Sequence, residues 1–255
     1  MNRLALVSDS TFSALSKSTT GHTSQLETSP RHRFARSFDL PYATFAPMHY
    51  EERYAYPLIV WLHGSDSNEQ ELRQVMPLVS MRNYVAIAPR GTSVGSRSRG
   101  RFEWCQSAEA IESAHARIVD CVAVAQERFN IHANRIFLVG RGVGGTMALR
   151  TAWSDPDRFA GVAAINGPLP SHSSPMRRVN ELRHIPCLLA TSRNHESYPS
   201  DQVCQDLRLL HSAGCTVALR QYPGSDDLTS NMLSDLDRWL MELVCGAPIA
   251  AKHTS

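Results

Sequence analysis

The chain has 255 residues, 42 % of them hydrophobic, and a formal net charge of +2 at pH 7. A chain of this length and composition can bury a substantial core in one domain. The small net charge and the scattered basic residues argue against a nucleic-acid partner, which requires a basic surface. The densest basic cluster, "GSRSRGR" at 95–101, is therefore expected to be a solvated loop.

The cysteines and the apolar runs indicate the compartment. The six cysteines lie far apart, without the C-x-x-C pair or the Cys/His spacing of a zinc site. We therefore expect reduced thiols, no metal, no cofactor and a cytoplasmic protein. No apolar run approaches the roughly 20 residues that cross a bilayer, so no membrane span is expected.

The N-terminal region differs in composition from the rest of the chain. Residues 1–33 are rich in Ser and Thr, which favours a disordered tail over a transit peptide. From residue 34 onward, the β-like segments "FARSFDL" and "YATFAPM" lead into the buried strand "YPLIVWLHG" at 56–64. We expect one domain over 34–246 and a flexible C-terminus over 247–255.

Strands and helices then alternate along the chain. The helix over 107–129 is indicated by apolar residues spaced three or four apart. Further strands are expected at 83–91, 135–140, 159–166, 185–192 and 215–223, with helices at 144–154, 200–213 and 230–245. This alternation predicts an α/β fold with a mostly parallel sheet of seven or eight strands and helices on both faces. Sites in such folds form at the carboxyl ends of the strands.

The turn "GRGVGG", Gly140–Gly145, follows a strand and precedes a helix. It matches G-x-G-x-x-G, which favours dinucleotide binding, but that motif normally ends the first strand and has an acid about 20 residues later. Here at least three strands come earlier, and the later region is "AAINGP". The same turn also matches the nucleophile elbow G-x-S-x-G, with Gly142 in the serine position.

Two neighbouring segments decide between these readings. "PLIVWLHGSDSNEQEL" at 57–72 is similar to the strand and oxyanion loop of α/β-hydrolases, and "DPDRFAGVAAINGPLP" at 155–170 follows the elbow. Together they resemble the phospholipase/carboxylesterase branch of that superfamily, including acyl-protein thioesterase-like enzymes, over about 43–244. The resemblance implies an α/β-hydrolase fold and a serine-hydrolase ancestry.

The resemblance also places the catalytic triad, and this chain departs from it. A serine hydrolase needs a hydroxyl nucleophile, an imidazole base and an orienting carboxylate. The family's nucleophile position holds Gly142, its acid position holds His195 and its histidine position holds Asp227. Glu196 serves as the acid if the alignment shifts by one residue. The resemblance therefore implies that the nucleophile and base positions are vacated.

The oxyanion loop and the pocket provide further candidate residues. The backbone N–H groups of Ser65 and Val143 are the expected oxyanion donors, whereas a carboxylate at Asp66 opposes an oxyanion. Arg141 is expected either to form a structural pair with Asp226 or Asp227 or to clamp a carboxylate or phosphate. The complete candidate set is His63, Gly64, Ser65, Asp66, Trp104, Cys105, Arg141 and Val143. Within it, His63 is expected to shape the loop, and Trp104 and Cys105 to line the pocket.

Three functions are compatible with these residues. The first is a catalytically degenerate hydrolase that acts as a binding or scaffold protein for a small acyl or ester-like ligand. The second is an ester or thioester hydrolase with a relocated nucleophile: Ser65, Ser67, Cys105, Ser192 or Ser225, of which Cys105 is the best placed. The third is nucleotide binding at Gly140–Gly145.

Overall fold

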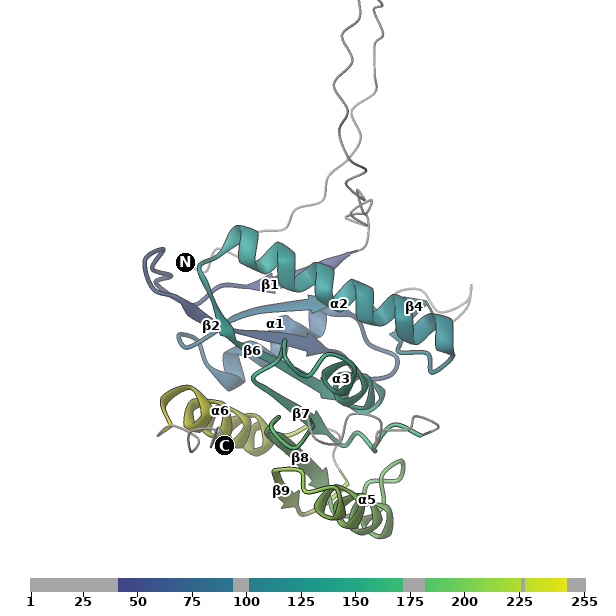
Figure 1. Ribbon diagram of the computed structural model, residues 1–255. Helices are drawn as coiled ribbons and strands as arrows, with labels where there is room; N and C mark the ends of the chain where they lie inside the picture. The colour runs from purple at the N-terminus through teal and green to yellow at the C-terminus, as the bar shows by residue number, and fades with distance from the viewer. Residues whose placement is uncertain (1–40, 94–100, 172–181, 226–227, 247–255) are drawn as a thin grey trace, which may run out of the picture.

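A computed structural model describes residues 41–93, 101–171, 182–225 and 228–246. Within these ranges the central sheet has seven strands in the order β1-β3-β2-β6-β7-β8-β9 (Figure 1). All neighbouring strands are parallel except β1, which runs antiparallel to β3. The strands are β1 (Tyr42–Phe45), β2 (Tyr56–Leu62), β3 (Val85–Pro89), β6 (Ile131–Arg141), β7 (Gly161–Ile165), β8 (Cys187–Ser192) and β9 (Val217–Tyr222). The predicted fold class is confirmed.

Helices cover both faces of the sheet (Figure 1). One face packs against α2 (Ala108–Arg128), α3 (Val143–Ser154) and α5 (Ser200–Ser212). The other packs against α1 (Leu72–Val79), which follows the short 3-10 helix η1 (Glu69–Glu71), and against α6 (Ser230–Cys245). Each strand therefore contributes side chains to two separate apolar layers.

Strand β2 shows why these strands are continuously apolar. Leu58, Val60 and Leu62 point into the layer with α2 and α3, whereas Ile59 and Trp61 point into the layer with α1 and α6. All five side chains are fully buried. A strand covered on both faces needs apolar residues at every position, whereas a half-exposed strand alternates.

The structure adds elements that the sequence did not predict. Helix α1 has only eight residues and contains Pro77. The polar loop after β3 contains a two-stranded antiparallel ribbon of β4 (Thr92–Ser93) and β5 (Phe102–Glu103). The predicted segment "FARSFDL", the predicted N-terminal tail and the predicted flexible C-terminus lie outside the described residues.

The carboxyl ends of the parallel strands meet at one edge of the sheet. At that edge β2 ends at Leu62, β3 at Pro89 and β6 at Arg141. Because β1 is antiparallel to β3, with Tyr42 paired to Pro89, the chain also enters the sheet there. The predicted site loops are therefore neighbours in space. None of the described helices is long and apolar enough to cross a membrane.

Candidate functional site

The turn between β6 and α3 has the backbone geometry of a nucleophile elbow. Gly142 lies at its apex with φ +54° and ψ −124°. Its N–H donates to the carbonyl of Ile165 at 2.8 Å, and its own carbonyl accepts from Thr146 N–H at 3.1 Å. These two hydrogen bonds, one to the N–H and one to the carbonyl of Gly142, hold its backbone at the positive φ. This conformation strains any residue with a side chain, which suits a nucleophile held on a sharp turn.

The glycines around the apex are required by close packing. A Cβ atom on Gly140 would overlap the carbonyl group of Gly144, and one on Gly144 would overlap the carbonyl oxygens of Leu62 and His63. By contrast, a Cβ atom on Gly142 would meet no heavy atom within 4 Å. The flanking glycines let α3 approach β2, so packing accounts for them without a bound phosphate. The apex itself faces open space.

The apex of the elbow carries no side-chain hydroxyl. Gly142 has no side chain, and the nearest hydroxyl along the helix is that of Thr146, which is buried and donates to the carbonyl of Pro168 at 2.8 Å. The elbow therefore holds the shape of a nucleophile turn without an atom that can attack a carbonyl.

The loop after β2 contains the expected oxyanion donors. Within the described part of the chain, neither the N–H of Ser65 nor that of Val143 has an acceptor. Asp66, the next residue, is exposed and has φ +56°, in the region that favours glycine. Asp and Asn are, after glycine, the residues that tolerate this conformation best, so an acid is compatible with the turn.

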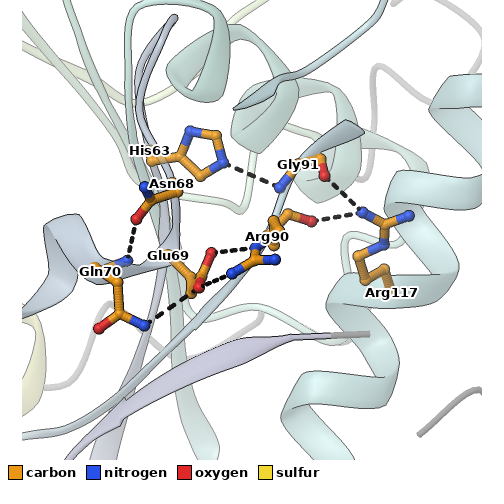
Figure 2. A network of polar contacts seen from close by, with 7 residues as sticks. All are labelled: His63, Asn68, Glu69, Gln70, Arg90, Gly91 and Arg117. Carbon is orange, nitrogen blue, oxygen red and sulfur yellow. Dashed lines mark hydrogen bonds and ion pairs between the residues drawn. The ribbon is translucent and has the colours of Figure 1, made fainter. Parts of the chain in front are cut away.

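His63 connects this loop to the loop after β3. The ring is fully buried, its Nδ1 lies 2.8 Å from the carbonyl of Gly64, and its Nε2 accepts from Gly91 N–H at 3.0 Å (Figure 2). Since the carbonyl can only accept, Nδ1 carries the proton. Burial lowers the pKa of His63 below its ordinary value. The imidazole is therefore a neutral connector between loops, with both nitrogens engaged by backbone.

Trp104 supports the same histidine from the other side. Its indole Nε1 donates to the carbonyl of His63 at 3.0 Å, and the two rings lie 5.3 Å apart. Trp104 is buried, whereas Cys105 is exposed. Trp104 and Cys105, which we expected to line the pocket together, therefore lie in different environments.

A buried ion pair stabilises the start of η1. The carboxylate of Glu69 is 1 % exposed and accepts two hydrogen bonds from the Arg90 guanidinium, at 2.5 and 2.6 Å (Figure 2). Burial alone would raise the pKa of Glu69, but the hydrogen bonds from Arg90, its own backbone and Gln70, together with the charge of Arg90, hold that pKa below its ordinary value. Arg117 on α2 donates to the carbonyls of Arg90 and Gly91. Two loops and a helix are thereby joined in one network.

A second buried pair lies beside the elbow. Arg141 Nη2 donates to Glu71 Oε2 at 2.8 Å, and the same carboxylate accepts from Trp61 Nε1 at 3.0 Å. Burial would raise the pKa of Glu71, but the hydrogen bond and charge of Arg141, together with hydrogen bonds from Ser67 and Trp61, lower it below its ordinary value. The guanidinium also covers Gly64, where a Cβ atom would lie 2.7 Å from Arg141 Cζ. Glu71 is a partner of Arg141 that we did not predict, and the expected partners, Asp226 and Asp227, lie outside the described residues.

A cavity of about 660 Å³ opens next to this pair. Of the candidate residues, Asp66 and Arg141 line it. Its apolar wall comes from α1 and from the start of α6. The lining residues are Asp66, Ser67, Asn68, Gln70, Glu71, Gln74, Val75, Leu78, Arg141, Leu228, Thr229, Ser230 and Leu233. We refer to it below as the α1/α6 cavity.

The segment after β8 is where the resemblance places the family's acid. His195 is buried there, and its N–H donates to the carbonyl of Ser192 at 3.3 Å, whereas Glu196 is exposed. The loop is joined to the end of β9 by a 2.9 Å hydrogen bond from Asn194 N–H to the carbonyl of Gly224. Asp227 lies outside the described residues. Among those that are described, no three His, Cys, Asp or Glu side chains form a group that could hold a metal ion.

The sequence reasoning missed the acidic and basic residues of these two networks. Glu69 and Glu71 lie within the segment 57–72 that resembles the oxyanion loop, but the sequence did not predict a role for either of them. One signal was available, because two acids directly precede the apolar spacing of Leu72, Val75 and Met76. Their partners Arg90 and Arg141 come from other loops, and nothing in the local sequence pairs them.

Comparisons with known proteins are consistent with this geometry. The phospholipase/carboxylesterase family model matches residues 50–243. A curated relative, NocK of Nocardia uniformis subsp. tsuyamanensis, is 29 % identical over 126 residues, which are 48 % of this chain. That match spans only 36 % of the length of NocK.

Solved structures of similar fold cover most of the chain. The carboxylesterase of Bacillus cereus superposes with a TM-score of 0.66 at 15 % identity, covering 82 % of this chain and 97 % of that one. A carboxylesterase from Mesorhizobium loti gives a TM-score of 0.65 at 18 % identity, covering 82 % and 95 %. At these identities the likeness shows the α/β-hydrolase fold alone, whereas the family match covers most of the sequence. The chain therefore belongs to the phospholipase/carboxylesterase family of α/β-hydrolases.

Proposed function

We propose that this member of the family has lost covalent serine-hydrolase chemistry and acts as a binding or scaffold protein. The observation that carries the proposal is Gly142, which occupies the apex of the elbow with φ +54° and no side chain. Triad members act as a unit, so loss of the nucleophile leaves at most about 10³–10⁴-fold catalysis over water from the oxyanion hole and binding. The missing histidine after β9 supports the same conclusion.

The ligand class that we propose is a small acyl or ester-like molecule in the α1/α6 cavity. The volume of about 660 Å³ lies in the range of small-molecule sites. Leu78 offers an exposed apolar side chain to the cavity, and Arg141 lines the same cavity. Val75 and Leu233, which also line it, are each 1 % exposed. The carboxylesterases of similar fold support this ligand class by analogy only.

A fluorophosphonate probe and p-nitrophenyl butyrate hydrolysis test the loss of chemistry. We expect the wild-type chain to show no labelling and no turnover above buffer, and Cys105→Ala to behave identically. Turnover that Cys105→Ala abolishes would show that the nucleophile has moved to that thiol, which is exposed. Stoichiometric labelling of any serine in the wild type would also overturn the proposal.

Rebuilding the triad provides a matched gain-of-function control. A serine side chain at Gly142 has open space, so Gly142→Ser should fold, and Gly142→Ser with Asp227→His supplies both missing groups. We expect the double variant to label faster than Gly142→Ser alone. Equal labelling by both would mean that another residue already serves as the base, and the vacated-base part of the proposal would be wrong.

Ligand binding is tested by the shift in melting temperature with butyrate, octanoate and their methyl esters. A ligand that binds only the folded chain adds about 2.7 kcal/mol of stability at 100 times its Kd. We expect octanoate to raise the melting temperature of the wild type but not of Leu78→Lys. If NAD or ATP at millimolar concentration gives the larger shift, the Gly140–Gly145 turn binds a nucleotide and the acyl ligand class is wrong.

A further inference from the structure

The N-terminal segment of the chain enters the fold at the edge that carries the candidate site. Strand β1 begins opposite the carboxyl end of β3, with Tyr42 paired to Pro89. The preceding residue, Pro41, accepts a hydrogen bond from Arg90 N–H at 3.1 Å. The residues before Pro41 are therefore attached next to the Arg90–Glu69 pair.

Only a short distance separates this entry point from the α1/α6 cavity. Arg90 binds Glu69, and the residues on either side of Glu69, Asn68 and Gln70, line the cavity. Strand β1 also packs against both η1 and α1. Seven residues, 34–40, can span up to roughly 23 Å when extended, so the segment before Pro41 has ample length to reach the cavity.

The lining of the cavity includes one exposed leucine, Leu78, and one exposed carboxylate, Asp66. Leu78 is 56 % exposed, more than any other large hydrophobic residue in the described ranges, whereas Val75 and Leu233, which also line the cavity, are each 1 % exposed. At the rim, Asp66 is exposed and forms no ion pair with any described residue. A chain segment that contacts both Leu78 and Asp66 is therefore favoured by an apolar group next to a positive charge.

The sequence just before Pro41 has this chemistry. Residues 31–36 read "RHRFAR", with one aromatic side chain, Phe34, between Arg33 and Arg36 and three arginines in total. We propose that residues 31–36 of this same chain occupy the α1/α6 cavity, with Phe34 against Leu78 and an arginine paired to Asp66. The segment then competes with any ligand for the cavity. The inference concerns access to the site and holds whether or not the chain hydrolyses esters.

Tethering makes weak contacts sufficient for this docking. An exposed ion pair changes an equilibrium constant only about 1.4-fold to 5-fold. A short connection holds the segment at an effective concentration in the millimolar range. The docked state is therefore populated without a high intrinsic affinity, and a ligand of moderate affinity displaces it.

Site-specific photo-crosslinking of the full-length chain tests the proposal. With p-benzoyl-phenylalanine in place of Phe34, we expect intramolecular crosslinks to peptides that contain 66–78 or 228–233. The matched control carries the same photo-crosslinker at Tyr54, an exposed aromatic residue remote in sequence from the cavity lining. Mixing ¹⁵N-labelled and unlabelled chains distinguishes crosslinks within one chain from those between two copies.

Cavity variants then test the specific contacts. We expect Asp66→Asn, which keeps a residue that tolerates positive φ, to lower the crosslink yield roughly twofold to fivefold. Leu78→Lys should lower the crosslink yield further, whereas Leu209→Lys, at a 41 % exposed position on α5, should leave it unchanged. Crosslinks to other regions, crosslinks between chains, or a yield that neither cavity variant changes would overturn the proposal.

Discussion

At the scale of single residues, Gly142 and its glycine neighbours have different physical roles. Gly140 and Gly144 are glycines because a Cβ atom would overlap backbone carbonyl groups. Gly142 has room for a side chain, and only its positive φ disfavours one. The elbow therefore keeps its shape through packing around the apex, and this shape does not depend on what the apex residue does chemically.

Alanine substitutions separate these two roles. Gly142→Ala should cost about 1–3 kcal/mol of unfolding free energy, because the residue is held in a sparsely populated backbone region. Gly140→Ala should cost more, about 3 kcal/mol or above, since the overlapping atoms belong to backbone that cannot turn away. Urea denaturation measures both values. An equal loss for the two variants would contradict the packing argument.

His63 makes stability depend on pH. Its folded pKa is lowered by burial below the ordinary value of 6.5, so the folded state favours the neutral ring. Protons are therefore taken up preferentially by the unfolded chain. The stability that His63 contributes is complete above pH 6.5 and is lost as the pH falls from 6.5 toward the folded pKa.

The dependence of the unfolding free energy on pH can be measured between pH 5.5 and 7.5. One histidine contributes at most about 1.4 kcal/mol per pH unit. His63→Gln, which keeps an acceptor for Gly91 N–H, should make the unfolding free energy depend less on pH in this range. His115 is the matched control because burial also lowers its pKa, so His115→Gln should leave the part due to His63 in place. If only His115→Gln changes the slope, the assignment to His63 is wrong.

At the scale of elements, the Glu69–Arg90 pair holds η1 against the loop after β3. The guanidinium also lies 4.6 Å from the centre of the Phe102 ring on β5, so one side chain connects three segments. A carboxylate buried to 1 % exposure depends on such a partner. The loop that bears Ser65 and Asp66 is thus positioned by an ion pair, neither member of which lines the α1/α6 cavity.

Breaking the Glu69–Arg90 pair should reverse the way in which stability depends on pH in the range where Glu69 titrates. Arg90→Met leaves the Glu69 charge buried and unpaired, which should cost about 3–5 kcal/mol at pH 7, whereas Arg90→Met with Glu69→Met should cost less. In the wild type, the contribution of Glu69 is lost as the pH falls below its ordinary value of 4.5. In Arg90→Met we expect the pKa of the buried, unpaired Glu69 to lie above its ordinary value in the folded state. The stability of this variant should therefore fall as the pH rises. Additive losses in the double-mutant cycle would contradict the coupling.

The elements differ in how far the sequence predicts them. The continuous apolar run of β2 and the spacing of Ile118, Val122 and Ala125 in α2 reflect burial directly, so both were predicted. Helix α1 was missed because eight residues interrupted by Pro77 give a weak helical signal. Strands β4 and β5 have two residues each, too few for any period.

The same limit applies to the site. The elbow could be predicted because its glycines are adjacent in the sequence and their spacing follows from close packing. The pairs Glu69–Arg90 and Glu71–Arg141 could not, because their members are 21 and 70 residues apart and meet only when the strands form one sheet. Local sequence patterns predict local backbone geometry, whereas ion pairs between loops depend on the tertiary fold and cannot be predicted from such patterns.

At the scale of the whole molecule, one apolar layer joins elements from both halves of the chain. Cys121 on α2 and Cys187 on β8 are buried in the same layer between the sheet and the helices α2, α3 and α5. Neither can be reached without separating a helix from the sheet. If the domain unfolds as one cooperative unit, both thiols become accessible in the same event.

Thiol labelling measures this cooperativity residue by residue. Burial raises the pKa of both Cys121 and Cys187 to about 12, so their thiols are unreactive in the folded state, since the thiolate is the nucleophile. With iodoacetamide in moderate urea, we expect the exposed Cys105, Cys204 and Cys245 to label first. Cys121 and Cys187 should then label slowly and at the same rate in peptide mass spectra. A faster rate at Cys121 would mean that α2 detaches before the sheet opens, because a helix on the outside can leave while the central strands stay paired.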